Sequence, residues 1–189
     1  SNGNETIFSK KYYTYDSNDL LSSSTEQTST GDILKHEYTY SASNSQYAQK
    51  NVLNRPLRIN KYLNAQLCHS HKETLKTVCD GIVVTDSVFE GKGNNVLELK
   101  QVYHKYDRYG NPTYVENVNG NDKILIWAYN GRYPVAEIEG ATYSEVKAAL
   151  GNIAPKSFSK YSLPFLSVLN NLRNTLPDAH ITIRTYKPL

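Results

Sequence analysis

The fold is decided by Tyr106-Asp107-Arg108-Tyr109-Gly110-Asn111, together with the later stretch Trp127-Ala128-Tyr129-Asn130-Gly131. The two stretches are 23 residues apart, counted from Tyr106 to Tyr129. A less regular copy starts at Tyr13-Thr14-Tyr15-Asp16 and reaches Tyr38-Thr39-Tyr40-Ser41, 25 residues from Tyr15 to Tyr40. A tyrosine-rich unit that recurs at this spacing predicts one short supersecondary unit, copied along the chain and packed on its neighbour.

The residue types of the motif indicate a β-hairpin. Gly110 and Asn111 tolerate the positive φ that a tight turn requires, and the Asp107 carboxylate can cap that turn. The flanking tyrosines predict rings that stack on one sheet face from copy to copy. The first copy has Asn18-Asp19-Leu20 where glycine would be expected, so its turn is expected to differ. The motif is therefore explained as scaffold, without a catalytic role.

Short β-prone segments separated by turn residues fill most of the chain. We expect strands near residues 8–15, 33–40, 57–63, 74–79, 82–85, 96–106, 113–118, 124–129, 135–138 and 180–186. Turns or polar loops are expected at 22–25, 29–32, 41–46, 91–95 and 119–122.

The hydrophobic period changes near the C-terminus. Thr142-Tyr143-Ser144-Glu145 is a capping box that starts a helix, and Gly151 ends it. A second helix follows Ser162, with an apolar stripe at Phe165, Leu169, Leu172 and Leu176. The sequence therefore predicts a mainly β fold of antiparallel hairpin repeats with a C-terminal helical pair. We expect one continuous domain in three segments: a degenerate hairpin at 1–50, the hairpin sheet with the clearest repeat at 51–140, and a two-helix cap with a final strand at 141–189.

Composition excludes several classes of protein. The 189 residues carry a net charge of +3 without a dense basic face, which argues against nucleic-acid binding. No apolar run approaches the ~20 residues needed to span a bilayer. The N-terminal residues 1–5 show no signal peptide and the chain contains no Met, so we expect a piece of a longer protein. Sixteen tyrosines against four Phe and one Trp indicate rings that either fill a thin core or line a binding surface.

Cys68 and Cys79 are the only cysteines and are a candidate disulfide; two free buried thiols are the alternative. Cys68, His69 and His71 with Cys79 are the best metal candidates, but their spacing matches no common zinc site, so we expect no metal and no cofactor. His69 and His71 would share one strand face without Cys68.

The motif residues are similar to those of the RHS, or YD, repeat family, in which Tyr-Asp, two residues and Gly begin a hairpin that closes on an aromatic strand. Further segments resemble surface or secreted RHS-repeat proteins of the Bacteroidetes type. The motif matches are Tyr106, Asp107, Gly110, Asn111, Trp127, Tyr129, Asn130 and Gly131, and the further segments are 51–56, 129–138, 141–143, 176–179 and 185–189. The resemblance implies an extracellular or cell-surface location and the remainder of a parent chain as partner.

We therefore expect a non-catalytic structural or interaction segment of an RHS-repeat protein. The first alternative is a carbohydrate-binding module that uses an aromatic sheet face; its candidate ligand-facing rings are Tyr103, Tyr109, Tyr114 and Tyr133. A weaker alternative is a glycan-processing enzyme, which needs two carboxylates about 5–10 Å apart across a pocket. The chain shows no nucleophile elbow, phosphate loop or HExxH pattern, which disfavours an enzyme. A glycan or another surface protein is the expected external partner.

Overall fold

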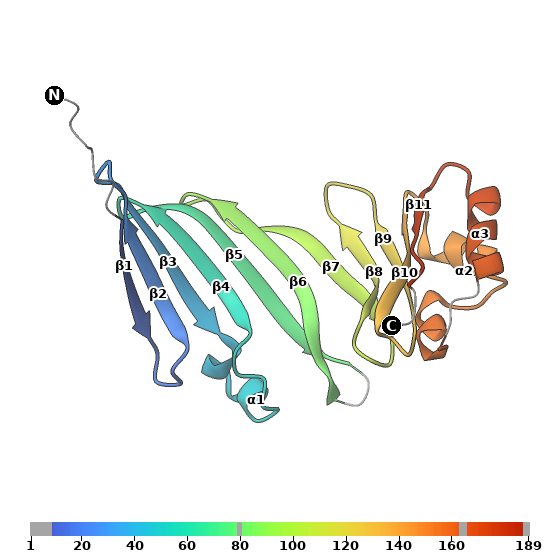
Figure 1. Cartoon of the computed structure of the whole chain (residues 1–189), viewed down its shortest axis with the longest axis horizontal. Helices are drawn as coiled ribbons and strands as arrows, with labels where there is room; N and C mark the ends of the chain where they lie inside the picture. The colour runs from blue at the N-terminus through green and yellow to red at the C-terminus, as the bar shows by residue number, and fades with distance from the viewer. Residues whose placement is uncertain (1–8, 79–80, 163–165, 187–189) are drawn as a thin grey trace. The chain divides into compact units, whose positions relative to one another are not determined.

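A computed structural model describes residues 9–78, 81–162 and 166–186. These residues form eleven strands in one antiparallel sheet, in which each strand is hydrogen-bonded to the next along the chain (Figure 1). The strands are β1 (Lys10–Tyr15), β2 (Leu21–Gln27), β3 (Ile33–Tyr40), β4 (Pro56–Leu63), β5 (Gln66–Thr77), β6 (Val83–Lys92), β7 (Glu98–Tyr106), β8 (Pro112–Asn117), β9 (Lys123–Ala128), β10 (Tyr133–Glu139) and β11 (His180–Ile183).

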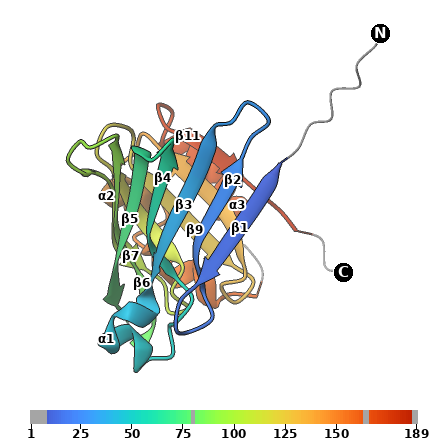
Figure 2. The same ribbon diagram turned by 90° about the vertical axis from the view of Figure 1, so that its left-hand side faces the viewer.

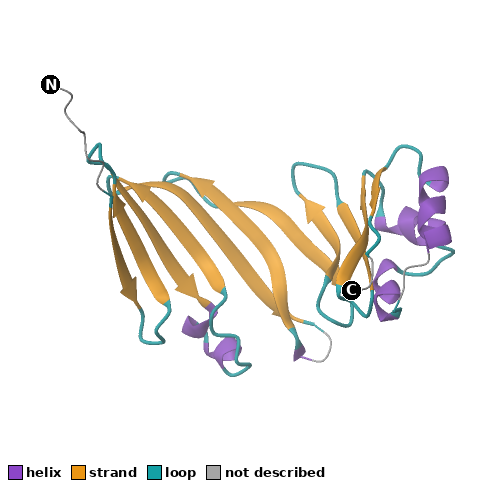
Figure 3. Ribbon diagram, viewed as in Figure 1, coloured by secondary structure: helices purple, strands orange, loops and turns teal. Residues whose placement is uncertain are grey.

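Short helices lie between β3 and β4 and near the C-terminus. The first two are η1 (Ser41–Ser43) and α1 (Ser45–Ala48), between β3 and β4. The C-terminal helices are α2 (Tyr143–Ala149), η3 (Pro155–Lys160) and α3 (Leu166–Thr175), drawn in purple in Figure 3. The prediction of a mainly β fold with C-terminal helices is confirmed.

The chain divides into two compact units. Unit 1 consists of Ser1–Thr74 and Val88–Leu99, and unit 2 of Leu75–Ser87 and Lys100–Leu189. The predicted segments 1–50, 51–140 and 141–189 describe the sequence pattern and stay a prediction.

The described residues of unit 1 form a layer of strands without a hydrophobic core of its own. Figure 2 shows β1, β2 and β3 side by side in this layer. All six residues of β1 are exposed, and all seven of β2 are at least partly so. Val88 is the one buried hydrophobic residue among the residues of unit 1 that the structure describes. Both faces of the layer therefore carry accessible side chains.

Unit 2 has a continuous core between the sheet and the C-terminal helices. Ile124 and Ile126 of β9 and Ile138 of β10 are fully buried against Leu169 and Leu172 of α3. Side chains alternate along a strand, so Lys123, Leu125 and Trp127 belong to the opposite face of β9. The core thus fixes which residues of unit 2 face away from the helices.

The predicted helix signals act as expected at α2. The Thr142 hydroxyl accepts from the Glu145 N–H, and the Glu145 carboxylate accepts from the Thr142 N–H at 2.8 Å. Gly151 has a φ of +70° after the helix. Leu169 and Leu172 lie buried on α3 as predicted, whereas Phe165 lies outside the described residues.

Several local predictions are wrong. Residues 22–25 are not a turn, because Ser and Thr side chains there belong to β2, which pairs with both β1 and β3. Residues 41–46 form η1 and the start of α1, with the Asn44 side chain capping the Gln46 N–H. β5 and β6 are longer than predicted because main-chain pairing continues through polar residues. The helix η3 was not predicted.

Candidate functional site: the motif turn and a polar pocket

The motif residues form a hairpin turn around a buried carboxylate. Asp107 is 2% exposed, and its Oδ1 accepts hydrogen bonds from the N–H groups of Tyr109 (2.8 Å) and Asn111 (2.9 Å). Its Oδ2 accepts from the Asn111 Nδ2 at 3.0 Å. Gly110 donates to the Asp107 carbonyl and has a φ of +82°. This is a type I turn closed by a left-handed residue, a common three-residue hairpin connection.

The second half of the motif is tied to this turn. The Asn111 Nδ2 also donates to the Gly131 carbonyl at 2.7 Å, and the Trp127 Nε1 donates to the Pro112 carbonyl at 2.8 Å. Asn111 has no positive φ, contrary to prediction; its side chain instead links the two parts of the motif. Tyr129 and Asn130 adopt positive φ, at +54° and +56°.

The first copy uses the same turn. The Asp16 Oδ1 accepts from the N–H groups of Asn18 (2.8 Å) and Leu20 (3.0 Å), two and four residues on, as Asp107 does. Asp19 donates to the Asp16 carbonyl and takes a φ of +59° in the place of Gly110. The expectation of a different turn is therefore wrong, because Asp tolerates the left-handed region better than most residues.

Two further hairpins repeat this pattern. In the first, the Thr28 N–H donates to the Asp32 carbonyl and the Gly31 N–H donates to the Thr28 carbonyl. The Thr28 hydroxyl accepts from the Asp32 N–H, in the place of the aspartate carboxylate of the Asp16 and Asp107 turns. Between β5 and β6 the same two main-chain hydrogen bonds occur, from the Val78 N–H to the Ile82 carbonyl and from the Gly81 N–H to the Val78 carbonyl. A glycine with positive φ occupies the fourth position of the turns at 28–32, 78–82 and 107–111, and Asp19 occupies it in the first copy.

The four candidate ligand-facing aromatics lie in different environments. Tyr109 packs on Gly131, and Tyr133 stacks on Tyr186 with ring centroids 4.6 Å apart. Tyr114 lies 5.0 Å from the His104 ring and 5.6 Å from the Tyr143 ring. Tyr103 lines a pocket, which is described next.

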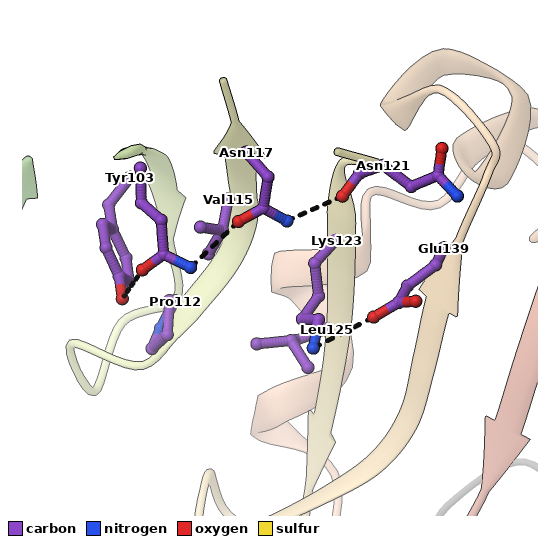
Figure 4. A pocket seen from close by; sticks show the side chains of 9 residues that line it. Tyr103, Pro112, Val115, Asn117, Asn121, Lys123, Leu125 and Glu139 are labelled. Carbon is purple, nitrogen blue, oxygen red and sulfur yellow. Dashed lines mark hydrogen bonds and ion pairs between the residues drawn. The ribbon is translucent and has the colours of Figure 1, made fainter. Parts of the chain in front are cut away.

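That pocket is an open depression of about 460 Å³ within unit 2, on the sheet face opposite the core (Figure 4). Cross-strand register builds it, because Tyr103 pairs with Val115, Val115 with Lys123, and Lys123 with Glu139. One row therefore crosses four strands. The other lining residues are Gln101, Pro112, Asn117, Asn121 and Leu125.

A chain of amides borders this row. Tyr103 donates to the Gln101 Oε1 at 3.2 Å, the Gln101 Nε2 donates to the Asn117 Oδ1 at 2.9 Å, and the Asn117 Nδ2 donates to the Asn121 carbonyl at 2.7 Å (Figure 4). Each hydrogen bond uses one N–H or one lone pair of a side-chain amide. A second N–H and a second lone pair remain, since an amide carries two of each.

The other side of the pocket is charged but balanced. The Lys123 Nζ lies 2.5 Å from the Glu137 Oε1 and 3.0 Å from the Glu139 Oε1, and Arg184 lies 3.2 Å from the Glu137 Oε2. The two carboxylates raise the pKa of Lys123, Glu137 most strongly. Hydrogen bonding and charge from Lys123, with a smaller effect of Arg184, lower the pKa of Glu137. Lys123 and Glu137 are thus both charged at neutral pH.

The predicted histidine pair lies in unit 1. His69 and His71 share one face of β5 as expected, with ring nitrogens 3.7 Å and 3.5 Å from the Glu90 carboxylate. Cys68 is exposed, and its thiol donates to the Gln66 carbonyl at 3.4 Å. Cys79 lies outside the described residues, so the disulfide stays a prediction. In the described part of the chain, no group of three or more His, Cys, Asp and Glu side chains is placed to hold a metal ion.

The sequence alone did not identify the pocket. Gln101, Asn117, Asn121, Lys123 and Glu139 are ordinary polar residues of strands and turns, and only the strand register brings them together. The available signal was the alternation in 123–128, which assigns Lys123 to the face away from the core.

No protein-family model matches this chain, and a search of curated proteins finds no match to it either. Among the described residues, no helix has the length and apolar character required to cross a membrane.

Proposed function

We propose that this chain is a non-catalytic structural and interaction segment of a cell-surface or secreted RHS-repeat protein. Two hairpins far apart in the chain, at Asp16 and Asp107, share one turn, as expected for a unit copied along a chain. The motif residues that resemble the family hold that turn and its neighbour together. Their polar groups are used for structure, which supports a scaffold role.

The open layer of unit 1 carries the proposal. Tyr12, Tyr13 and Tyr15 of β1 are 59%, 54% and 62% exposed. Apolar burial is the main favourable term in folding, and a β-layer usually obtains it from a second layer. A layer with exposed rings and few buried side chains is suited to being covered by other protein. The partner that we propose is the remainder of the parent chain, or another surface protein.

Amide hydrogen exchange tests this role. Exchange is measured for β1 to β4 in this chain alone and in the complete protein isolated from its native cell surface or medium. We expect exchange in these strands to slow by about a hundredfold or more in the native protein, because coverage suppresses local opening. β9 and β10, which are already buried, serve as the internal control.

Two results would overturn the proposal. Equal exchange rates in both samples would show that nothing covers the layer. A polysaccharide hydrolase activity that disappears in a folded Glu137→Gln or Glu116→Gln variant would make the chain an enzyme.

The aromatic-platform version of carbohydrate binding has less support. Tyr109, Tyr114 and Tyr133 contact Gly131, His104 and Tyr186 respectively, and do not form one platform with Tyr103. A glycan role is better served by the polar pocket of unit 2.

A further inference from the structure

We propose that the pocket bordered by Gln101, Asn117 and Lys123 binds a neutral saccharide. The inference goes beyond the scaffold role and does not rest on it, because it concerns unit 2 and one local arrangement of side chains. The pocket volume, about 460 Å³, falls in the range of about 300–1,000 Å³ that is usual for small-molecule sites.

The hydrogen-bonding groups of the pocket fit hydroxyl groups. A sugar hydroxyl both donates and accepts, so it needs donors and acceptors within a short distance of each other. Gln101 and Asn117 each have one amide hydrogen bonded to a neighbour and another remaining. The Lys123 ammonium group pairs with the carboxylates of Glu137 and Glu139 and carries a third N–H. On Glu139, the oxygen that pairs with Lys123 is Oε1.

The floor of the pocket fits the C–H face of a sugar ring. Val115 and Leu125 provide apolar side chains from β8 and β9, Pro112 lies at one end, and Tyr103 adds an aromatic ring. Tyr103 stacks on Tyr106, with centroids 6.3 Å apart, which holds its ring in place. An aromatic ring with neighbouring amides combines apolar contact with directional hydrogen bonds.

The charges of the pocket favour an uncharged ligand. Lys123 is shared by Glu137 and Glu139, and Arg184 pairs with Glu137, so two cations face two carboxylates. An anion such as a uronate or a sulfate would have to displace Glu139 from Lys123 and then face both carboxylates. A cation would meet Lys123. Neither charged ligand would meet an unpaired group of opposite charge, so nothing would offset the free energy of removing it from water.

The test is an NMR titration of the whole chain. The probes are glucose, galactose, mannose and N-acetylglucosamine with their short oligomers, and glucuronate and inorganic sulfate are the charged comparison. We expect at least one neutral probe to shift the side-chain amide signals of Gln101, Asn117 and Asn121 in a saturable way. Gln101→Leu and Asn117→Ala should each weaken binding about tenfold, the effect of losing one or two hydrogen bonds to the ligand.

Asn174→Ala is the matched control, because Asn174 is an exposed amide on α3 at the other face of the sheet. It should bind as the unchanged chain does. The proposal is overturned if no neutral probe shifts these signals while the spectrum remains folded, if Asn174→Ala weakens binding equally, or if only glucuronate or sulfate binds. None of these outcomes changes hydrogen exchange in β1 to β4, so failure here is distinct from failure of the scaffold role.

Discussion

The ring of Tyr109 lies on the backbone of Gly131 so closely that a β-carbon on Gly131 would be 2.2 Å from its Cδ2 atom. Gly131 also has a φ of +75° and accepts the hydrogen bond from Asn111. The two halves of the motif are therefore joined by a contact that only glycine permits. Backbone conformation and steric fit contribute separately to this requirement, and they can be measured separately.

Gly131→Ala should lower the free energy of unfolding by about 3 kcal/mol or more, because strain in the left-handed region is added to a clash with the Tyr109 ring. Gly151→Ala is the control, since Gly151 has a φ of +70° and nothing within 4 Å of an added β-carbon. It should cost only about 1–2 kcal/mol. Urea unfolding followed by Trp127 fluorescence measures both. Adding Tyr109→Ala should recover part of the Gly131→Ala loss; no recovery would contradict the steric explanation.

Asp107→Ala should destabilise unit 2 by about 3 kcal/mol, because it removes three hydrogen bonds to a buried carboxylate and leaves N–H groups without an acceptor. Asp107→Asn keeps the Oδ1 acceptor but sets an amide donor against the Asn111 amide, so an intermediate loss is expected. The equivalent Asp16→Ala should cost less, since that carboxylate accepts only two hydrogen bonds and is partly exposed. A larger loss of unfolding free energy in Asp16→Ala than in Asp107→Ala, measured by denaturation curves, would contradict this account.

Tyr114 should ionise at a higher pH than an ordinary tyrosine. Its hydroxyl donates to the Asp122 Oδ2 at 2.8 Å, which together with burial raises its pKa to about 12. An unfolded tyrosine has a pKa of about 10. The proton is thus held more tightly in the folded state, and the linked stability is present below about pH 10 and lost as the pH rises towards 12.

Tyr114→Phe removes this linkage. The variant should be less stable than the parent chain below pH 10 by about 1 kcal/mol, the usual worth of one hydrogen bond, and the difference should shrink towards pH 12. Ultraviolet absorbance titration should lose one tyrosine step near pH 12. Tyr15→Phe, at a ring that is 62% exposed, should leave that step intact. If the step persists in Tyr114→Phe, the assignment is wrong.

Glu137 should stabilise unit 2 at neutral pH and not in acid. Its pKa is lowered chiefly by Lys123, so the folded state holds the proton less tightly than the unfolded chain. The linked stability is present above the ordinary glutamate pKa of about 4.3 and is lost as the pH falls below it. Glu137→Gln should therefore reduce the folding stability at pH 7. The stability of this variant should also fall less steeply than that of the parent chain as the pH is lowered. Thermal unfolding between pH 7 and 3 measures this, with Asp178→Asn, an exposed carboxylate, as the control.

Local chemistry explains which features could be predicted. The capping box of Thr142 and Glu145 was predicted because all its contacts lie within four residues. The Asp107 turn was predicted for the same reason, although its Asn111 was assigned the wrong role because that side chain acts on Gly131, 20 residues away. β2 was missed because its Ser and Thr residues resemble a turn in isolation, and pairing with two neighbours makes them a strand.

By itself, the sequence determined the class of fold, the positions of most strands and the main turn. These features depend on residues close together in the chain, through the alternation of side chains, helix capping and residues that tolerate positive φ. Only the tertiary structure decided that one layer has two accessible faces and that Tyr103, Lys123 and Glu139 share a pocket. Both depend on strand register and on the face that the helices cover, and a shift of one residue would turn every side chain of a strand to the other face.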